Sequence, residues 1–328
     1  MLVPPRIAAL PRFALLDGRS PLARLPRFSE ALGGSAEVWI KREDLLPLAF
    51  GGNKLRNLEF LIGAALAEGA DTLITSGRRW SNHCRLTAAA GARAGLAVHL
   101  VLTGPPRPPG AEGPNQVLEE LFGATIHVTA TADREERAGL VDEIAGIVRA
   151  SRGRPFVIDV GGTGPVGAAG QVLAGMELVE QLDDAGVELA TVILPSATGG
   201  THAGLLHGLA VGGPPPRSVI GIAVAAPSAE LRPNIATLLE RLAPLTGVRP
   251  PDEAIALEDD QLGDGYGART LDADEATRLL ARTEGILVDP IYTAKALAGL
   301  IARVRDGPLQ GPVVFWHAGG TPGLFEPL

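Results

Sequence analysis

The middle of the sequence alternates short runs of β-branched and apolar residues with longer segments of helical periodicity. Apolar residues recur at helical spacing between Leu55 and Leu66, Gly69 ends that segment, and the run at 72–75 follows as a buried strand. The same alternation predicts further strands at 97–102, 125–128, 156–160, 191–194, 219–224 and 313–316. It predicts helices at 55–66, 83–94, 115–122, 133–149, 171–182, 203–210, 234–245, 274–284 and 293–305. This order is typical of βαβ units, so we predict an α/β fold with mostly parallel strands.

Three polar, glycine-rich segments follow predicted strands, at 76–83, 196–204 and 317–323. In parallel sheets, ligands bind at the carboxyl ends of the strands, where the chain turns into the next helix. We therefore expect the three segments to meet at one site. A fourth glycine-rich stretch, at 161–170, has the composition of a crossover between two domains.

Composition excludes several classes of protein. The 328 residues carry a net charge of −8 and no basic cluster, which argues against nucleic acid as a partner. Apolar runs are too short to span a bilayer, and the proline-broken segment 1–28 does not resemble a signal peptide, so we expect a cytoplasmic protein without membrane contact. The single cysteine, Cys84, excludes an intramolecular disulfide and a cysteine-rich zinc site.

Lysine is scarce in this chain. Lysine and arginine together number 29, and only Lys41, Lys54 and Lys295 are lysines. Lys54 follows two glycines and begins a predicted helix, where a cation opposes the helix dipole. Such a position suits an amine that is kept deprotonated for Schiff-base formation. A surface lysine beside a loop remains the alternative.

The segment from Ser196 to Thr201 joins a predicted strand to a predicted helix. Its backbone N–H groups, its hydroxyls and the helix dipole together suit a single phosphate group. A Walker lysine and a dinucleotide-binding glycine pattern are both missing, which disfavours a nucleoside triphosphate and a nicotinamide oxidoreductase. A tight turn packed for steric reasons is the alternative.

Other polar residues are ambiguous on local sequence alone. Ser81 could simply cap the helix that starts at Asn82, and His83 could be an ordinary helix histidine. His202 and His317 do not have convincing metal-ligand spacing, so we expect no metal site.

Several motifs, taken in order, resemble those of one enzyme family. They are KREDL at Lys41, GGNKLRNLEF at Gly51, ADTLITSG at Ala70, SNHCRLTAAA at Ser81, THAGL at Thr201, GYG at Gly265, EGILVDPIYTAKALAGLI at Glu284 and HAGGTPGLF at His317. Together they resemble the D-cysteine desulfhydrase and 1-aminocyclopropane-1-carboxylate (ACC) deaminase family of pyridoxal-phosphate enzymes, which is tryptophan synthase β-like. The resemblance extends from Trp39 to Phe325 and so covers most of the chain.

The resemblance implies a fold and an assembly. It implies two open, twisted, mostly parallel sheets with helices on both faces. A large cofactor-binding domain would comprise residues 1–48 and 162–328, a small domain would comprise residues 49–161, and the active site would lie in the cleft between them. It also implies a homodimer.

The resemblance also implies roles for individual residues. Lys54 would bind pyridoxal 5'-phosphate as an imine and then move protons at the substrate Cα. Other predicted cofactor ligands are Asn53, Asn82, Thr198, Gly199, Gly200, Thr201 and Thr293. With Lys54, the predicted catalytic residues are Ser81, Tyr266 and Tyr292, and the small amino-acid substrate would contact Ser81, His83, Trp80 and Arg79. The implied reaction is β-elimination from an amino acid with a leaving group on Cβ, and D-cysteine would give pyruvate, ammonia and sulfide.

Four departures from the family pattern keep alternatives open. Thr293 stands where ACC deaminases resemble one another in having glutamate, which favours the desulfhydrase branch. Ala318 lacks the hydroxyl expected near the cofactor ring nitrogen, so Thr293 or Thr321 could replace it, and Asn57 lacks the usual positive charge.

The fourth departure is the turn Arg78-Arg79-Trp80, which stands where a glutamine is usual. It could bind an anionic side chain such as that of cysteate, or it could be a solvated arginine pair with a packed indole. ACC deamination, a cysteate sulfo-lyase-like reaction and a repurposed, non-catalytic relative are the remaining hypotheses.

Overall fold

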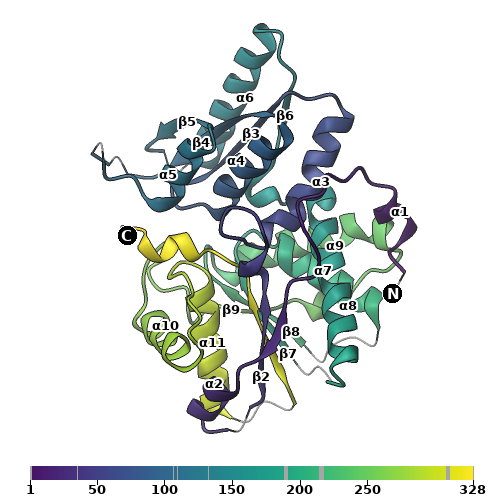
Figure 1. The fold of residues 1–328 in the computed structure, drawn as a ribbon, viewed down its shortest axis with the longest axis vertical. Coiled ribbons are helices and arrows are strands. Elements are labelled where there is room, and N and C mark those ends of the chain that lie inside the picture. Colours follow the sequence, from purple (N-terminus) through teal and green to yellow (C-terminus); the bar gives the residue numbers. More distant parts are fainter. Residues whose placement is uncertain are drawn as a thin grey trace.

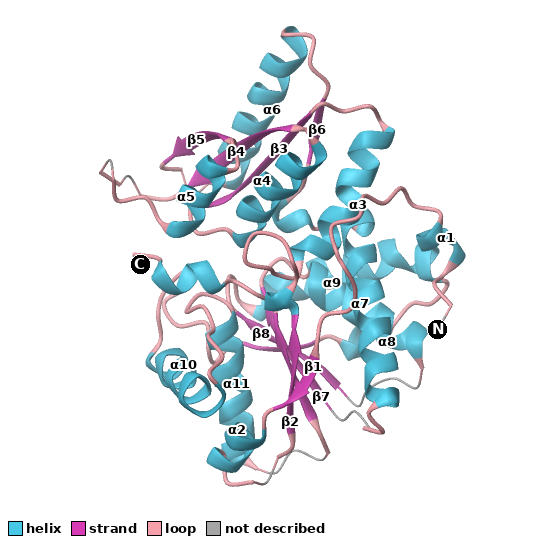
Figure 2. Cartoon of the chain, in the orientation of Figure 1, coloured by secondary structure: helices cyan, strands magenta, loops and turns pink. Residues whose placement is uncertain are grey.

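Two sheets form the framework of the protein (Figures 1 and 2). The computed structural model describes residues 2–34, 36–105, 107–108, 110–131, 133–187, 191–213, 218–307 and 311–327. The larger sheet has six strands in the order β1-β2-β10-β7-β8-β9, and only the β1–β2 pair is antiparallel. Its strands are β1 (Leu22–Arg24), β2 (Val38–Arg42), β7 (Thr191–Ser196), β8 (Ser218–Ala223), β9 (Ala256–Glu258) and β10 (Val313–His317).

The smaller sheet has four parallel strands in the order β5-β4-β3-β6 and forms the upper part of Figure 1. Its strands are β3 (Thr72–Arg78), β4 (Ala97–Thr103), β5 (Thr125–Thr129) and β6 (Pro155–Val157). Every strand of this sheet falls between residues 49 and 161, the range predicted for the small domain. The domain boundaries themselves stay a prediction.

Helices cover both faces of each sheet. The α-helices are α1 (Pro5–Ala8), α2 (Pro26–Ala31), α3 (Lys54–Ala67), α4 (Asn82–Ala94), α5 (Pro114–Leu121), α6 (Arg134–Ala150), α7 (Pro165–Asp184), α8 (Gly200–Gly212), α9 (Ser228–Thr246), α10 (Leu271–Glu284) and α11 (Thr293–Asp306). Single 3₁₀ turns occur at Glu43–Leu45, Val160–Gly162, Asp252–Ala254 and Thr321–Phe325. The predicted fold class, an α/β fold with two mostly parallel sheets, is confirmed.

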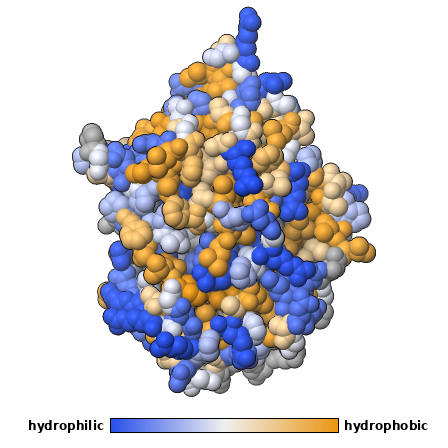
Figure 3. Space-filling model, in the orientation of Figure 1, coloured by the Kyte–Doolittle hydropathy of each residue, from blue (hydrophilic) through white to orange (hydrophobic). Residues whose placement is uncertain are grey.

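Each face of the six-stranded sheet has its own core. Helices α7, α8 and α9 contribute to one cluster of buried residues, and α2, α10 and α11 contribute to the other. In the smaller sheet, α6 packs on β3 and β4 through Ile144 and Val148, while α3 and α4 cover the opposite face. No helix within the described residues is both long and apolar enough to cross a bilayer. The face in Figure 3 is a mosaic of hydrophilic and hydrophobic side chains.

The glycine-rich stretch 161–170, predicted to be a crossover between domains, is partly helical. Helix α7 already begins at Pro165, six residues before the predicted start at Gln171. Glycines inside its first turns are required by close packing, because a Cβ on Gly170 would lie 2.0 Å from the carbonyl oxygen of Arg56, in α3. These glycines therefore allow α3 and α7 to approach closely instead of interrupting the helix.

A buried ionic network lies where α3 meets the large sheet. Arg56 donates two hydrogen bonds to Glu43, at 2.6 and 2.8 Å, and two to Glu177, both at 2.9 Å. Lys41 binds Glu177 from the other side and donates to the carbonyl of Ser20 at 2.8 Å. Burial opposes ionisation of Glu177, but Arg56 and Lys41 outweigh it and hold the pKa of this carboxylate below its usual value. The network thus links Arg56, which lies two residues after Lys54, to Glu177 of α7 and through it to Lys41 of β2.

Candidate active site

One cavity of about 590 Å³ opens between the two sheets. Its lining includes the carboxyl ends of β3 and β7 and the first residues of α3, α4 and α8. Two of the three predicted glycine-rich segments, 76–83 and 196–204, therefore meet there, and Ala318 and Gly319 of the third also line it. All three segments therefore contribute to one cavity, and the site itself stays a prediction. The predicted residues that line it are Asn53, Lys54, Ser81, Asn82, His83, Thr198, Gly199, Thr201, Tyr266 and Tyr292.

Lys54 opens α3 at the base of this cavity. Gly51 and Gly52 precede it with φ angles of 65° and 130°, and a Cβ on Gly51 would lie 2.1 Å from the carbonyl oxygen of Asp44. Only glycine fits this turn, which delivers the lysine into the cavity. Burial lowers the pKa of Lys54 to about 8, because the interior disfavours the ammonium form. The side chain is therefore a much better nucleophile near neutral pH than an exposed lysine.

Asn53 connects this lysine to the opposite wall of the cavity. Its side-chain Nδ2 donates to Thr201 Oγ1 at 2.9 Å, and its backbone N–H donates to the carbonyl of Ala318 at 2.9 Å. Gln171 of α7 then donates to the carbonyl of Asn53 at 2.8 Å and to Asn57 Oδ1 at 2.6 Å. Sequence reasoning missed Gln171, because its role is visible only in the buried hydrogen bonds.

The turn before α8 has the properties of an anion cradle. Gly199 has a φ of 86° at the N-cap, and no side chain there caps the first backbone N–H groups of the helix. Thr198 and Thr201 add hydroxyls, and Thr198 Oγ1 accepts a 2.6 Å hydrogen bond from Thr163. Free N–H groups at a helix N-terminus bind phosphate well. Gly200 belongs to the same turn, as its first helical residue.

Helix α4 presents an oriented amide to the cavity. Ser81 caps the helix by accepting a 3.2 Å hydrogen bond from the N–H of Cys84. Asn82 follows, and its Oδ1 accepts a 3.3 Å hydrogen bond from Asn115 Nδ2, which also donates to the carbonyl of Trp80 at 2.9 Å. Because Asn115 occupies the oxygen of Asn82, the NH₂ group is left to donate toward a ligand. Asn115, from α5, is a second residue that sequence reasoning missed.

His83 is fully enclosed and neutral. Its Nε2 lies 3.0 Å from the hydroxyl of Thr75, which donates to the carbonyl of Ile158 at 2.8 Å, so Nε2 carries the proton. Its Nδ1 is a buried acceptor without a hydrogen-bond partner among the described residues. Burial, with a smaller contribution from Lys54, lowers the pKa of His83 to about 3. An unprotonated, unpartnered nitrogen is thus available close to the lysine.

Two tyrosines form another wall. The Tyr266 and Tyr292 hydroxyls are hydrogen-bonded to each other, and the Trp80 ring packs edge-on against Tyr266 at 5.8 Å between ring centroids. Burial raises the pKa of Tyr266 to about 12 and also raises that of Tyr292, so both stay protonated at neutral pH. Asp289 accepts 2.9 Å and 3.1 Å hydrogen bonds from the backbone N–H groups of Tyr292 and Thr293, and so fixes this turn. Asp289 is the third residue that sequence reasoning missed, although it precedes Pro290 in the DPIY motif.

Not every predicted residue reaches the cavity. Thr293 is fully buried and its hydroxyl donates to Asp289 at 2.6 Å, away from the lining. Trp80 packs against Tyr266 and is absent from the described lining, and Arg79 is buried beside Gly104. Arg78, at the end of β3, does line the cavity. Of the two arginines, Arg78 alone is part of the described lining.

Two of the sequence departures have a clear structural setting. Asn57 is fully buried, and its Nδ2 donates to the carbonyl of Gly162 at 3.1 Å, so it serves as a link between α3 and the turn before α7. Ala318 lines the cavity and contributes no hydroxyl. Thr321 is absent from the described lining.

These residues fit a phosphorylated aldehyde. A buried amine of lowered pKa, an uncapped helix N-terminus and an oriented NH₂ donor share one cavity. Comparison with known proteins identifies this phosphorylated aldehyde, because residues 13–319 match the family model for pyridoxal-phosphate dependent enzymes. The chain belongs to this family. Its cofactor is pyridoxal phosphate.

Similar proteins refine this assignment. A D-cysteine desulfhydrase of Klebsiella pneumoniae subsp. pneumoniae is 41% identical over 327 residues, covering 97% of each chain. A second D-cysteine desulfhydrase, from another Klebsiella pneumoniae strain, is also 41% identical, with the same coverage. A crystal structure of an ACC deaminase homologue has a TM-score of 0.89 and 34% identity over 98% of this chain and 95% of that one.

A threonine deaminase from T.th. has a TM-score of 0.65 at 22% identity, over 92% of each chain. At that identity the likeness shows the fold alone. The pyridoxal-phosphate enzyme therefore has both the fold and the family that its motifs imply.

Proposed function

We propose that this pyridoxal-phosphate enzyme is a lyase that removes a leaving group from Cβ of a small amino acid, as a D-cysteine desulfhydrase does. The observation that carries the proposal is the joint location of Lys54 and the open N-terminus of α8 in one cavity. The 41% identity to two D-cysteine desulfhydrases along nearly the full chain supports the choice of reaction.

Bound pyridoxal phosphate supplies an electron sink that makes the Cα proton of an amino acid removable. Lys54 is the proposed point of covalent attachment and the base that moves this proton. Its pKa of about 8 supports both roles, since a group that titrates near the working pH can accept a proton and return it. Asn53 holds the turn that carries the lysine.

Besides Lys54, two groups of the chain would position the cofactor. We assign its phosphate to the turn Thr198–Thr201, where helix α8 leaves backbone N–H groups free. The NH₂ of Asn82 would donate to the ring oxygen beside the aldehyde. Thr293, in contrast, is engaged by Asp289, so we propose that it acts by fixing the Tyr292 turn and leaves the ring nitrogen without a charged partner.

The substrate lies between α4 and the tyrosine pair. The Ser81 hydroxyl accepts one hydrogen bond from its own helix and keeps its proton to donate to the substrate carboxylate. His83 is neutral and presents an acceptor nitrogen, which suits the substrate amine. Tyr266 and Tyr292 stay protonated, so they serve as hydrogen-bond partners beside the leaving group.

ACC deamination is the second candidate, because the structural likeness to an ACC deaminase homologue is extensive. Thr293 argues against it, since the resemblance implies a glutamate at this position in deaminases. Production of 2-oxobutanoate from ACC at a rate comparable to pyruvate formation from D-cysteine would reverse our preference.

We further propose that the enzyme is a cytoplasmic homodimer with domains at 1–48 with 162–328 and at 49–161. The support for the dimer is the family resemblance, and the support for the division is that all four strands of the smaller sheet fall in one range. Light scattering should give about twice the chain mass of 33.9 kDa. A monomeric mass would remove the assembly proposal.

The scarcity of lysine allows a decisive test of the attachment site. Borohydride reduction of the holoenzyme should fix the cofactor on the peptide that contains Lys54, while Lys41 and Lys295 are fully buried and hydrogen-bonded elsewhere. Lys54→Ala should lose this adduct and pyruvate formation from D-cysteine. An adduct on Lys41 or Lys295, or full activity of the variant, would refute the assignment.

The reaction is then tested with a panel of amino acids. D-cysteine, L-cysteine, β-chloroalanine, serine and cysteate are scored for pyruvate, and ACC for 2-oxobutanoate. Pyruvate from at least one of the first five supports elimination. Failure of the whole panel with a correctly attached cofactor would indicate a repurposed relative.

A further inference from the structure

Four arginines line the cavity without a carboxylate partner among the described residues, namely Arg78, Arg134, Arg137 and Arg241. Arg241 lies in α9, while the other three belong to the four-stranded sheet and its helix α6. Arg78 ends β3, and Arg134 and Arg137 lie one turn apart at the start of α6, on one face of that helix. Within the described residues, none of the three makes a side-chain hydrogen bond or an ion pair. Other arginines with buried or surface carboxylates nearby do pair with them, as Arg56 and Arg249 do.

Arg78, Arg134 and Arg137 line the same cavity as Tyr266. Arg137 has a pKa below its usual value because of burial, and then because of repulsion from Arg78 and Arg134. Tyr266 is also among the groups that influence Arg137 electrostatically, and it lines the same cavity. The cluster is thus separate from the turn Thr198–Thr201, which belongs to the other sheet.

A purely structural role explains this cluster poorly. Like charges repel, and Arg134 is the first residue of its helix, where a cation opposes the helix dipole. Asp159 and Glu230 also line the cavity, but neither forms an ion pair with these arginines among the described residues. Glu135 and Glu136, in the same turn of α6, lie outside the lining.

We propose that Arg78, Arg134 and Arg137 bind a tetrahedral oxyanion, a sulfonate or a phosphate ester, on the side chain of the amino-acid substrate. The inference rests on the proposed elimination reaction and narrows its substrate class. The cofactor phosphate is assigned to α8 and the substrate carboxylate to α4, so a third anion-binding cluster calls for a third anion. Guanidinium groups match the geometry of such oxyanions and stay charged.

Cysteate is a suitable probe for this class. During its elimination the Cα–H bond breaks and the proton passes to Lys54, while the Cβ–S bond breaks and its electron pair leaves with sulfite. One water then converts the released enamine into pyruvate and ammonium, so no oxidant or reductant is required. O-phosphoserine would release phosphate in the same way. Comparing it with cysteate shows whether the site prefers a phosphate ester or a sulfonate.

Binding is measured first, without turnover. Calorimetric titration of the holoenzyme with 3-sulfopropanoate, which has no amine to react, should show binding that butanoate lacks. Arg137→Gln and the exposed-site variant Arg134→Gln should each weaken it at least about tenfold, because each removes charge-assisted hydrogen bonds. The matched control is Arg149→Gln, at the far end of α6 about 22 Å away, which should bind as the wild type does.

Kinetics then compare anionic and neutral substrates. The ratio of kcat/KM for cysteate or O-phosphoserine to that for β-chloroalanine should fall at least about tenfold in Arg78→Gln and Arg137→Gln. Suppose that the wild type turns over β-chloroalanine, but 3-sulfopropanoate binds to no variant or binds equally to all. This result would refute the anion site and leave the lyase function intact. If 3-sulfopropanoate binding depends on the arginines but no substrate is turned over, the lyase function is refuted and the anion site is retained.

Discussion

Removal of Arg56 should destabilise the protein far more than removal of a surface arginine. In Arg56→Met the aliphatic volume is kept, but the buried carboxylates of Glu43 and Glu177 lose four hydrogen bonds between 2.6 and 2.9 Å. Glu43 is fully buried and retains, among the described residues, only the hydroxyl of Ser20 as a side-chain partner. Leaving a buried charge uncompensated costs about 3–5 kcal/mol, so we expect a loss of that size in the free energy of unfolding.

The matched control is Arg249→Met. Arg249 also binds two carboxylates, Glu240 and Asp252, but its side chain is 37% exposed and theirs are 70% and 55% exposed. Solvent screening limits such pairs to about 0–1 kcal/mol. Equilibrium urea denaturation of the three proteins, followed by circular dichroism, gives both differences at pH 7.

The effect of Arg56 should also depend on pH. In the wild type the folded-state pKa of Glu177 is lowered, so this carboxylate stabilises the fold above its unfolded pKa of about 4.5, and the contribution is lost as pH falls through the lower folded value. Without Arg56 the buried carboxylates favour protonation, so the difference between variant and wild type should narrow between pH 7 and pH 4.5. A loss below about 1 kcal/mol at pH 7, or a difference that widens on acidification, would refute the assignment of this network as a buried, charged cluster.

Three further predictions use other parts of the structure. Cofactor uptake by the apoenzyme should accelerate as pH rises from 7 to 9, because Lys54 with its pKa of about 8 loses its proton over this range; a flat stopped-flow profile would contradict it. Asn115→Ala should weaken cofactor affinity roughly tenfold, since the amide of Asn82 loses the donor that orients it; unchanged affinity in spectroscopic titrations would exclude this role. Gly170→Ala should destabilise by at least about 1–3 kcal/mol, because its Cβ would meet the Arg56 backbone at 2.0 Å. The control is Gly146→Ala in helix α6, where an added Cβ meets no atom within 4 Å and should stabilise the protein by up to about 1 kcal/mol. Equal shifts in melting temperature for Gly170→Ala and Gly146→Ala would show that close packing at Gly170 does not contribute to stability.

Hydrophobic periodicity predicted the long elements well. The predicted strand at 97–102 is β4 (Ala97–Thr103), and the predicted helix at 293–305 is α11 (Thr293–Asp306). Short edge strands such as β1 (Leu22–Arg24) and β9 (Ala256–Glu258) were missed, because three residues carry too little periodic signal. Glycine inside α7 was misread as loop, since a sequence does not reveal that a neighbouring backbone lies against it.

The site was predictable where residue type limits the chemistry and less so where contacts decide it. Lys54 and the turn Thr198–Thr201 were chosen from composition and position, and the structure places residues of both on one cavity, while their roles stay predictions. Asn115 and Gln171 act by orienting other amides, and amide residues are too common for sequence to single them out. Arg137 lies about 60 residues from Arg78 in the chain, and only the packing of α6 on β3 brings the two together.

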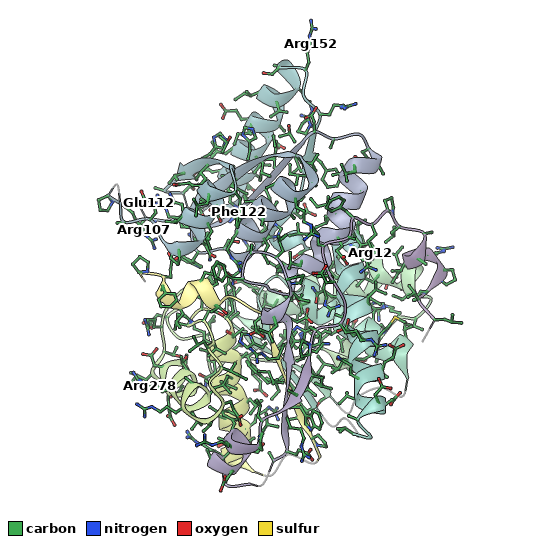
Figure 4. The ribbon with its side chains drawn as sticks, in the orientation of Figure 1. Arg12, Arg107, Glu112, Phe122, Arg152 and Arg278 are labelled. Atoms are coloured by element: carbon green, nitrogen blue, oxygen red, sulfur yellow. The ribbon has the colours of Figure 1, made fainter. Side chains whose placement is uncertain are left out.

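The placement of α3 has a consequence for movement during catalysis. This helix begins with Lys54, yet its glycine-mediated contact with α7 and the Arg56 network fasten it to the six-stranded sheet. The C-terminal segment contacts the loop after β4 through the Arg107–Glu326 ion pair at 2.8 Å, and Figure 4 labels Arg107 on the left. Because α3 also packs on the four-stranded sheet, the turn that carries Lys54 is held by both sheets, and any movement of one sheet relative to the other would have to disturb one of these contacts.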